Sequence, residues 1–227
     1  MTDISYNPVK DKTLQKVSAH QPNFLPWVGF WNKLISSDTF VLTTGLQYAK
    51  KSFANRVWMI DNNTWATVPV KSSYLPYKKI QITSMSAVNQ IGRRIKHWSK
   101  EKKYTYRDRL EPIIYKLTHN DEKNLSNFNI DLIFLVLKII NNKKTKIVIN
   151  SKEWKGFSKV NIIKDILDND GQLFLSGKSA KNYLLKEELA FIKNISFQVI
   201  KNDVSNETIL HAIAREKNPL SYIKNAA

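Results

Sequence analysis

Residues 16–43 read KVSAHQPNFLPWVGFWNKLISSDTFVLT, and this stretch decides the fold class of the chain. Lys16–His20 has the composition of a short strand, and the polar, proline-containing turn Gln21–Asn23 follows it directly. Leu25–Ile35 has apolar residues at the three- and four-residue intervals of a helix, and Thr39–Thr43 has the composition of a second strand. A strand, a helix and a strand in this order are typical of an α/β protein.

The last third of the chain repeats this alternation. The sequence predicts strands at Lys146–Ile149, Gln172–Leu175 and Ile195–Ile200, with helices at Val160–Leu167 and Ala180–Leu189 between them. Strands that alternate with helices at this spacing are joined by crossover connections. Such connections place the strands parallel to one another in one sheet.

The middle of the chain has a different pattern. Short β-type runs separated by polar turns indicate an antiparallel layer, and longer segments with helical spacing follow them. The β-type runs are Arg56–Ile60, Trp65–Val70 and Lys79–Thr83, and the helical segments are Tyr106–Leu117 and Leu125–Ile140. We predict a single α/β domain over residues 1–227, with a Rossmann-like, mostly parallel sheet, an antiparallel β insertion at residues 52–84 and a helical region at residues 86–141.

Composition narrows the possible chemistry. The chain has 227 residues, 42% of them hydrophobic, which is enough apolar material for one sizeable core. It has no cysteine, which excludes disulfides, thiolate zinc sites and a cysteine nucleophile, and no histidine pair has metal-ligand spacing, so we predict no metal site. The N-terminus lacks the apolar core of a signal peptide, and no apolar stretch is long enough to span a bilayer. The expected location is the cytoplasm.

The charge balance predicts an anionic partner. The chain has 36 Lys and Arg residues against 19 Asp and Glu residues, a formal net charge of +17 at pH 7. A field of this sign concentrates nucleic acid, nucleotides or another polyanion near the protein. A compositional drift toward Lys and Asn would also enrich lysine, although it would not leave acidic residues so scarce.

The first candidate site lies where the first strand ends and the first helix begins. In an open α/β sheet, ligands bind outside the carboxyl ends of the strands, and the next helix offers unpaired N–H groups to an anion. His20 and Gln21 are the candidate catalytic residues, because histidine acts as an acid or base near neutral pH, and Pro22 and Asn23 are substrate-binding candidates. The alternative is a hydrogen-bonded, structural His20 in a turn that the prolines only shape.

Two other segments carry clustered basic residues. In residues 47–56, Lys50, Lys51 and Arg56 are candidates to clamp a phosphate that Asn55 orients, and a solvated basic loop is the alternative. Residues 93–109 mix basic and aromatic side chains, as expected where a nucleic-acid backbone binds and a base stacks; a helix face with its aromatic residues turned inward would give the same string. The candidate nucleic-acid contacts are Arg93, Arg94, Lys96, Trp98, Lys102 and Lys103.

Five motifs in a fixed order carry a resemblance to a known family. They are HQPNFLPWVGFWNKL from His20, DTFV from Asp38, LQYAKKSFANR from Leu46, WATVPV from Trp65 and LFLSGKSAKNYL from Leu173. Together they resemble the motif set of WbqC-like proteins from about residue 17 to about residue 200. The first motif is the most specific, because a His-Gln-Pro turn, a second proline and a helix glycine rarely occur together by chance.

The resemblance implies a set of site residues. Motif matching gives His20, Gln21, Pro22, Gln47, Lys50, Asn55, Arg56, Ser176, Gly177 and Tyr183. The Ser176–Gly177 turn is expected to face the His20 turn across one cleft, where N–H groups of the following helix receive an anion. Thr44 and Gly45 stand where acidic residues are expected in the family, which puts a carboxylate metal ligand or base there in doubt. No cofactor follows from the resemblance.

The resemblance also implies a class of function. WbqC-like proteins are associated with bacterial surface-polysaccharide genes, where they help to decorate sugars, and some occur among bacteriophage genes. The chain is therefore expected to be a transferase that joins a small amine, amino-acid or acyl group to a phosphorylated or activated acceptor. The charge of +17 favours modified bases in DNA as the acceptor, and surface-polysaccharide (O-antigen) biosynthesis is the alternative. A non-catalytic nucleic-acid-binding module is the alternative from a different class.

A weaker likeness points to nucleotidyl transfer. The strand, the His-x-Pro turn, the helix with an early glycine and the second strand are similar to the opening of a nucleotidyltransferase superfamily whose motif pairs two histidines around a glycine. Phe30 stands where the second histidine is expected. Loss of one of two phosphate contacts should impair that chemistry severely.

Overall fold

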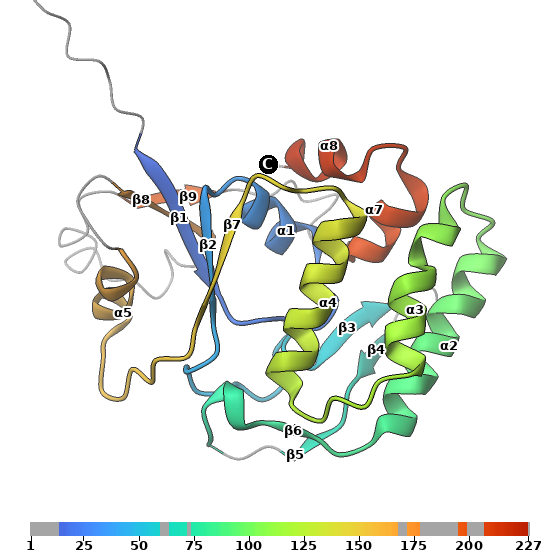
Figure 1. The fold of residues 1–227 in the computed structure, drawn as a ribbon, viewed down its shortest axis with the longest axis horizontal. Coiled ribbons are helices and arrows are strands. Elements are labelled where there is room, and N and C mark those ends of the chain that lie inside the picture. The colour runs from blue at the N-terminus through green and yellow to red at the C-terminus, as the bar shows by residue number, and fades with distance from the viewer. Residues whose placement is uncertain are drawn as a thin grey trace, which may run out of the picture.

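The computed structural model describes residues 14–59, 64–71, 74–167, 172–177, 195–198 and 207–226. At its centre is a five-stranded parallel sheet in the order β7-β2-β1-β8-β9 (Figure 1). The strands are β1 (Gln15–His20), β2 (Thr39–Thr43), β7 (Lys146–Asn150), β8 (Gln172–Gly177) and β9 (Ile195–Gln198). The predicted Rossmann-like α/β sheet is confirmed.

The sheet is wound in two directions from β1. On one side β1 pairs with β2 and β2 with β7, and the chain then returns to place β8 and β9 on the other side of β1. The winding therefore reverses between β1 and β8. In open parallel sheets, ligands bind in the crevice outside the carboxyl ends of the strands at such a reversal. A ligand site is therefore expected at the carboxyl ends of β1 and β8, next to His20 and Gly177.

The two faces of the sheet bury different clusters. Val17, Val41 and Phe174 pack on the face covered by α5 (Lys159–Ile166). Phe40 and Leu42 lie on the opposite face, in the larger cluster that includes α1 (Val28–Ile35) and α4 (Leu125–Ile139). This alternation is the expected two-residue period of strands buried on both faces. Figure 1 shows α5 on one side of the sheet and α1 and α4 on the other.

The antiparallel insertion and the other helices of the helical region lie beside α1 and α4, away from the parallel sheet, as Figure 1 shows. Two small antiparallel pairs form the insertion, and three helices follow it, which matches the predicted organisation of this part of the chain. The pairs are β3 (Arg56–Met59) with β4 (Thr64–Thr67) and β5 (Val70–Lys71) with β6 (Gln81–Ile82). The helices are α2 (Met85–Glu101), α3 (Glu111–Thr118) and α4, with 3₁₀ turns η1 (Tyr77–Lys79) and η2 (Arg107–Leu110).

Some element boundaries differ from the sequence prediction. The run Trp65–Val70 divides into β4 and β5 at Pro69, which has no N–H to donate to a strand ladder. The sequence did not predict α7 (Ile209–Arg215) or α8 (Pro219–Lys224), although Asn218 before Pro219 is a typical helix start. The predicted helix Ala180–Leu189 lies outside the described residues. In the ranges that the structure describes, no helix is long and apolar enough to cross a membrane.

A buried polar cluster ties the insertion and α4 to the turn after β1. The Tyr77 hydroxyl donates to the carbonyl oxygen of Pro22 at 2.7 Å. Asn129 Nδ2, from α4, lies 2.6 Å from Tyr77 Oη, 2.6 Å from the carbonyl oxygen of Ala54 and 3.1 Å from that of Pro22. Tyr77 and Asn129 are fully buried. Because buried carbonyl groups need hydrogen-bond donors, these two side chains hold two loops in place.

We predict that Asn129→Leu lowers the free energy of unfolding by about 1–3 kcal/mol, because it leaves a buried carbonyl without its donor. Urea unfolding followed by tryptophan fluorescence measures the loss. Asn127→Leu is the matched control, since Asn127 is an exposed asparagine of the same helix. Equal losses in the two variants would show that the cluster contributes nothing specific.

Candidate functional site

The carboxyl edge of the sheet brings together the ends of β1 and β8. Val17 pairs with Phe174, and each strand continues three residues further, to His20 and to Gly177. The two predicted turns therefore begin at adjacent strand ends. Their side chains diverge, because strand alternation directs Ser176 to the same face as Phe174, whereas His20 contacts α1 on the other face. Ser176 is buried, and Tyr183 lies outside the described residues.

His20 is partly buried against α1. Its ring meets Phe30 edge-on, with 5.3 Å between ring centroids, so the position expected for a second histidine is filled by an apolar wall. The Nδ1 atom lies 2.8 Å from the carbonyl oxygen of Gln21. Since a carbonyl only accepts, Nδ1 carries the hydrogen of the neutral ring and Nε2 is the acceptor.

The environment keeps the His20 ring neutral. Burial and the nearby positive charge of Lys33 lower the pKa of His20 to about 3, and the hydrogen bond to Gln21 offsets only part of this effect. At neutral pH the ring is therefore not an imidazolium and lacks the second proton that a histidine acid would give. Of the two roles predicted from the sequence, that of proton acceptor fits this environment.

Lys33 is a site residue that the sequence reasoning missed. Its Nζ donates to the carbonyl oxygen of Ala19 at 3.0 Å and lies 5.9 Å from the centroid of the Phe40 ring. Burial lowers the pKa of Lys33 to about 8. Every other residue of α1 is buried. A single lysine within this apolar segment is therefore a sequence feature that could have identified Lys33 as a candidate site residue.

The residues after His20 organise the loops around the edge. Gln21 Nε2 donates to the carbonyl oxygen of Gln47 at 3.1 Å, which joins the loop after β1 to the loop after β2. Pro22 and Asn23 are buried behind this contact. Lys50 is exposed, with Nζ 6.0 Å from the centroid of the Tyr74 ring.

Asn55 and Arg56 have different environments. Asn55 is buried, and its Nδ2 donates to the carbonyl oxygen of Val68 at 2.9 Å, so this amide holds the ends of the β3–β4 hairpin together. The Arg56 guanidinium stacks 4.1 Å from the centroid of the Trp65 ring. Its Nε is buried and has no hydrogen-bond partner among the described residues. Arg56 is therefore the better placed of the two to meet a ligand.

The loop after β2 has no room for an acidic side chain at position 45. A Cβ on Gly45 would lie 1.8 Å from the carbonyl oxygen of Lys152, because this loop passes close to the backbone that follows β7. In the part of the chain that the structure describes, no three histidine, aspartate or glutamate side chains lie close enough together to hold a metal ion.

The basic surface of α2 differs in part from the prediction. Trp98 is only 3% exposed and packs against Tyr104 and His211, so its ring cannot stack on a base; this correction follows from its position on the apolar face of the helix. Arg94 donates to the Thr64 hydroxyl at 3.0 Å. The other four predicted contacts, Arg93, Lys96, Lys102 and Lys103, are exposed. Exposed Lys100 joins Arg93 and Lys96 at helical spacing on α2, and exposed Lys103 follows two residues after the helix ends; we call these four residues the α2 stripe.

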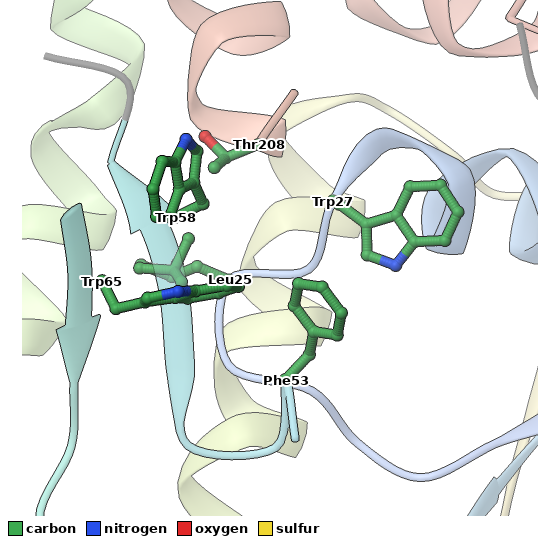
Figure 2. A pocket seen from close by; sticks show the side chains of 7 residues that line it. Leu25, Trp27, Phe53, Trp58, Trp65 and Thr208 are labelled. Atoms are coloured by element: carbon green, nitrogen blue, oxygen red, sulfur yellow. The ribbon is translucent and has the colours of Figure 1, made fainter. Parts of the chain in front are cut away.

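An aromatic cavity of about 310 Å³ lies beside the loop that leads from β1 to α1 (Figure 2). The loop, the segment before β3, the β3–β4 hairpin and the residue before α7 contribute its walls. The lining residues are Leu25, Trp27, Phe53, Val57, Trp58, Trp65 and Thr208. The sequence analysis did not predict this cavity, because its aromatic residues come from segments whose packing the sequence does not reveal.

We predict that the His20 ring stays neutral, with the proton on Nδ1, from pH 8 down to about pH 4. The folded-state pKa is lowered from 6.5 to about 3, so acid favours the unfolded state, and the stability that His20 contributes above pH 6.5 falls as the pH drops toward 3. Nitrogen-15 NMR of the imidazole measures this, with His20→Gln to assign the signals. A titration midpoint near 6.5 would contradict the described environment.

Comparison with known proteins identifies the family of the chain. The chain is 31% identical over 72 residues to the uncharacterized protein Rv1507c of Mycobacterium tuberculosis, a match that spans 31% of each chain. No solved structure matches the chain. The model of the WbqC-like protein family matches residues 21–205, which include the loop after β1, the insertion and the helical region. The chain belongs to the WbqC-like protein family.

Proposed function

We propose that the protein is a transferase that binds a phosphate-bearing acceptor at the carboxyl edge between β1 and β8 and joins a small amine, amino-acid or acyl group to it. The observation that carries the proposal is the pairing of His20 with Lys33 at the reversal of the sheet. A neutral imidazole and a partly buried ammonium there supply a proton acceptor and a positive charge side by side.

Each of the two side chains has a separate task in this proposal. Lys33 Nζ has further N–H groups besides the one given to Ala19, and these attract a phosphate oxygen. His20 Nε2 accepts the proton that an amine or hydroxyl nucleophile loses as it bonds to the activated group. The bond between that group and its phosphate breaks, and the phosphate leaves with the electron pair beside Lys33. A bound phosphate would raise the His20 pKa, because a nearby negative charge favours the imidazolium, and would make the ring a stronger base.

Other predicted residues lie around the carboxyl edge of the sheet and contribute to the proposed binding of the acceptor. Gln21 sets the position of the loop that carries Gln47 and Lys50. Arg56 adds a cation beside the aromatic cavity. Gly177 ends β8 next to β1, where its backbone can approach an anion.

DNA that carries modified bases is the acceptor we favour. The support is the formal charge of +17 and the α2 stripe, which places three exposed cations along one face of α2 and a fourth just after its end. A sugar nucleotide of surface-polysaccharide biosynthesis is the alternative acceptor. A sugar nucleotide would bind through the phosphate contacts at the edge of the sheet, but it would not contact the α2 stripe.

We predict that DNA from cells expressing the protein together with its neighbouring genes contains an additional nucleoside mass. The mass should be absent with His20→Gln and strongly reduced with Lys33→Gln, because one variant lacks the proton acceptor and the other the phosphate charge. Nucleoside digestion followed by mass spectrometry is the measurement. Lys155→Gln is the control, since Lys155 is an exposed lysine at which no effect is expected. Unchanged product in the His20→Gln variant would exclude the proposed role of His20.

We also predict salt-sensitive DNA binding through the α2 stripe. Replacing Arg93, Lys96, Lys100 and Lys103 with glutamine should flatten the plot of log affinity against log salt concentration by about 3–4, since each phosphate contact contributes a slope of about 0.9. Fluorescence anisotropy with a labelled duplex measures the slope. A matched variant with glutamine at Lys143, Lys144, Lys146 and Lys155, all exposed lysines elsewhere, controls for net charge. Equal slopes in the two variants would contradict a specific stripe.

A nucleic-acid-binding module without catalysis is the second candidate, and the α2 stripe is the observation that favours it. The two functions differ in their response to His20→Gln. A pure binder keeps its DNA affinity and salt dependence in that variant and makes no product with or without it. A protein with no salt-sensitive affinity for DNA would leave the sugar-nucleotide acceptor as the better proposal.

A further inference from the structure

The aromatic cavity has walls that meet at steep angles. Trp58 and Trp65 lie 5.2 Å apart between ring centroids with 71° between their planes, and Phe53 and Trp65 lie 5.5 Å apart at 64°. Figure 2 shows Trp65 and Trp58 on one side of the cavity, Phe53 and Trp27 on the other, and Thr208 at its upper edge. A flat ring placed here can stack on one wall and meet the edges of the others, which are the two favourable arrangements of aromatic rings.

The cavity walls carry indole N–H groups, which are hydrogen-bond donors. Among the described residues, none accepts a hydrogen bond from the indole N–H of Trp27, Trp58 or Trp65, whereas Trp31 donates to the Pro26 carbonyl and Trp154 donates to Asp165. Indole N–H groups at the walls of an aromatic cavity can donate to a ligand that carries acceptor atoms on a ring.

The position of Trp27 is built into the fold. A Cβ on Gly29 would lie 1.8 Å from the Trp27 ring, so the glycine allows the indole to lie against the first turn of α1. On its other side Trp27 forms a backbone bridge with Thr208, and the Val28 N–H donates to the carbonyl oxygen of Glu207 at 2.8 Å. Contacts with α1 on one side and with residues 207–208 on the other therefore fix the position of Trp27.

Charge and polarity exclude two other ligand classes. The Arg56 guanidinium covers one face of Trp65 at 4.1 Å, and this positive charge opposes a quaternary ammonium, which an aromatic cage would otherwise attract. A sugar needs several hydrogen-bond acceptors as well as donors. The described lining contains no carboxylate or side-chain amide, and its one hydroxyl, on Thr208, already lies 3.1 Å from His211 Nδ1.

We infer that the aromatic cavity is a binding site for a single nucleobase, which stacks on the indole and phenyl walls and accepts hydrogen bonds from indole N–H groups. Its volume of about 310 Å³ is at the small end of ligand pockets, so it suits one ring system. Arg56, with its unpartnered Nε, lies where the phosphate or carbonyl oxygens of a nucleotide would meet a donor. The inference deepens the proposed function by giving the acceptor, a nucleotide or nucleic acid, a binding site for its base. The identification of the bound base as part of the acceptor rests on the proposed function, whereas nucleobase binding by the cavity does not.

The test is an NMR titration of the whole chain with thymidine or adenosine. These nucleosides carry no phosphate, so they report on the cavity independently of the carboxyl edge. We expect saturable shifts of the indole N–H signals of Trp27, Trp58 and Trp65, while those of Trp31 and Trp154, which have partners, stay in place. Ribose and choline at the same concentrations should cause no shift.

Nucleoside affinities of cavity variants test whether the aromatic rings of the cavity stack on the base. Trp65→Ala and Phe53→Leu should weaken nucleoside affinity by about five- to a hundredfold, the range expected for loss of one stacking ring. Gly29→Ala should weaken it as well, because the new methyl group displaces Trp27. Phe134→Leu is the control, since Phe134 is an exposed aromatic residue of α4 outside the cavity lining.

Three results would overturn the inference. They are shifts caused by choline or ribose in place of nucleosides, an absence of shifts at the three cavity tryptophans, and unchanged affinity in both Trp65→Ala and Phe53→Leu. Thermal unfolding of each variant shows that it is folded; Trp65 and Phe53 are about 40% exposed, so little stability should be lost. A missing product in the DNA experiment would remove the proposed transferase and leave a positive titration standing.

Discussion

The hydrogen bonds that Tyr77 and Asn129 give to the carbonyl groups of Pro22 and Ala54 are the constraint on which the site depends. The chain leaves β1 through a turn rich in proline, and its backbone there has no neighbouring strand to pair with. Buried carbonyl groups in that situation need other donors. The insertion and the helical region supply them, so these parts of the chain hold the turn that begins the site, although they lie outside the parallel sheet.

A second constraint is the apolar surrounding of His20 and Lys33. Burial lowers the pKa of both groups, and the positive charge of Lys33 lowers the pKa of His20 further, so both groups shift toward their neutral forms. Neither group has an acidic side chain to balance it in the described environment; the hydrogen bonds that His20 and Lys33 make go to backbone carbonyl oxygens. A site with unbalanced positive charge and two lowered pKa values is prepared for an anion, which would restore the balance.

The sequence predicted the sheet well and the side-chain surroundings poorly. The alternation of strands and helices is a local pattern, so β2 was found with its observed ends, and β1 and β7 to within one residue. Trp98 was assigned to the surface because the sequence around it is basic, yet its position on the helix face turns it into the core. Lys33 was not identified, although a single lysine within an apolar helix is a local sign of a partly buried lysine. The aromatic cavity depends on contacts between residues as far apart as Trp27 and Thr208, which no local pattern describes.

The bridge between Trp27 and Thr208 also bears on when the protein becomes competent during its synthesis. The Val28 N–H donates to the carbonyl oxygen of Glu207, and the Ile209 N–H donates to that of Pro26. The start of α1 therefore pairs with a segment that emerges from the ribosome much later. A nascent chain that has been made only as far as β9 can complete the sheet, but it lacks the last wall of the cavity. The proposed ligand capture would therefore begin only after the segment around Thr208 has been made, later than assembly of the sheet.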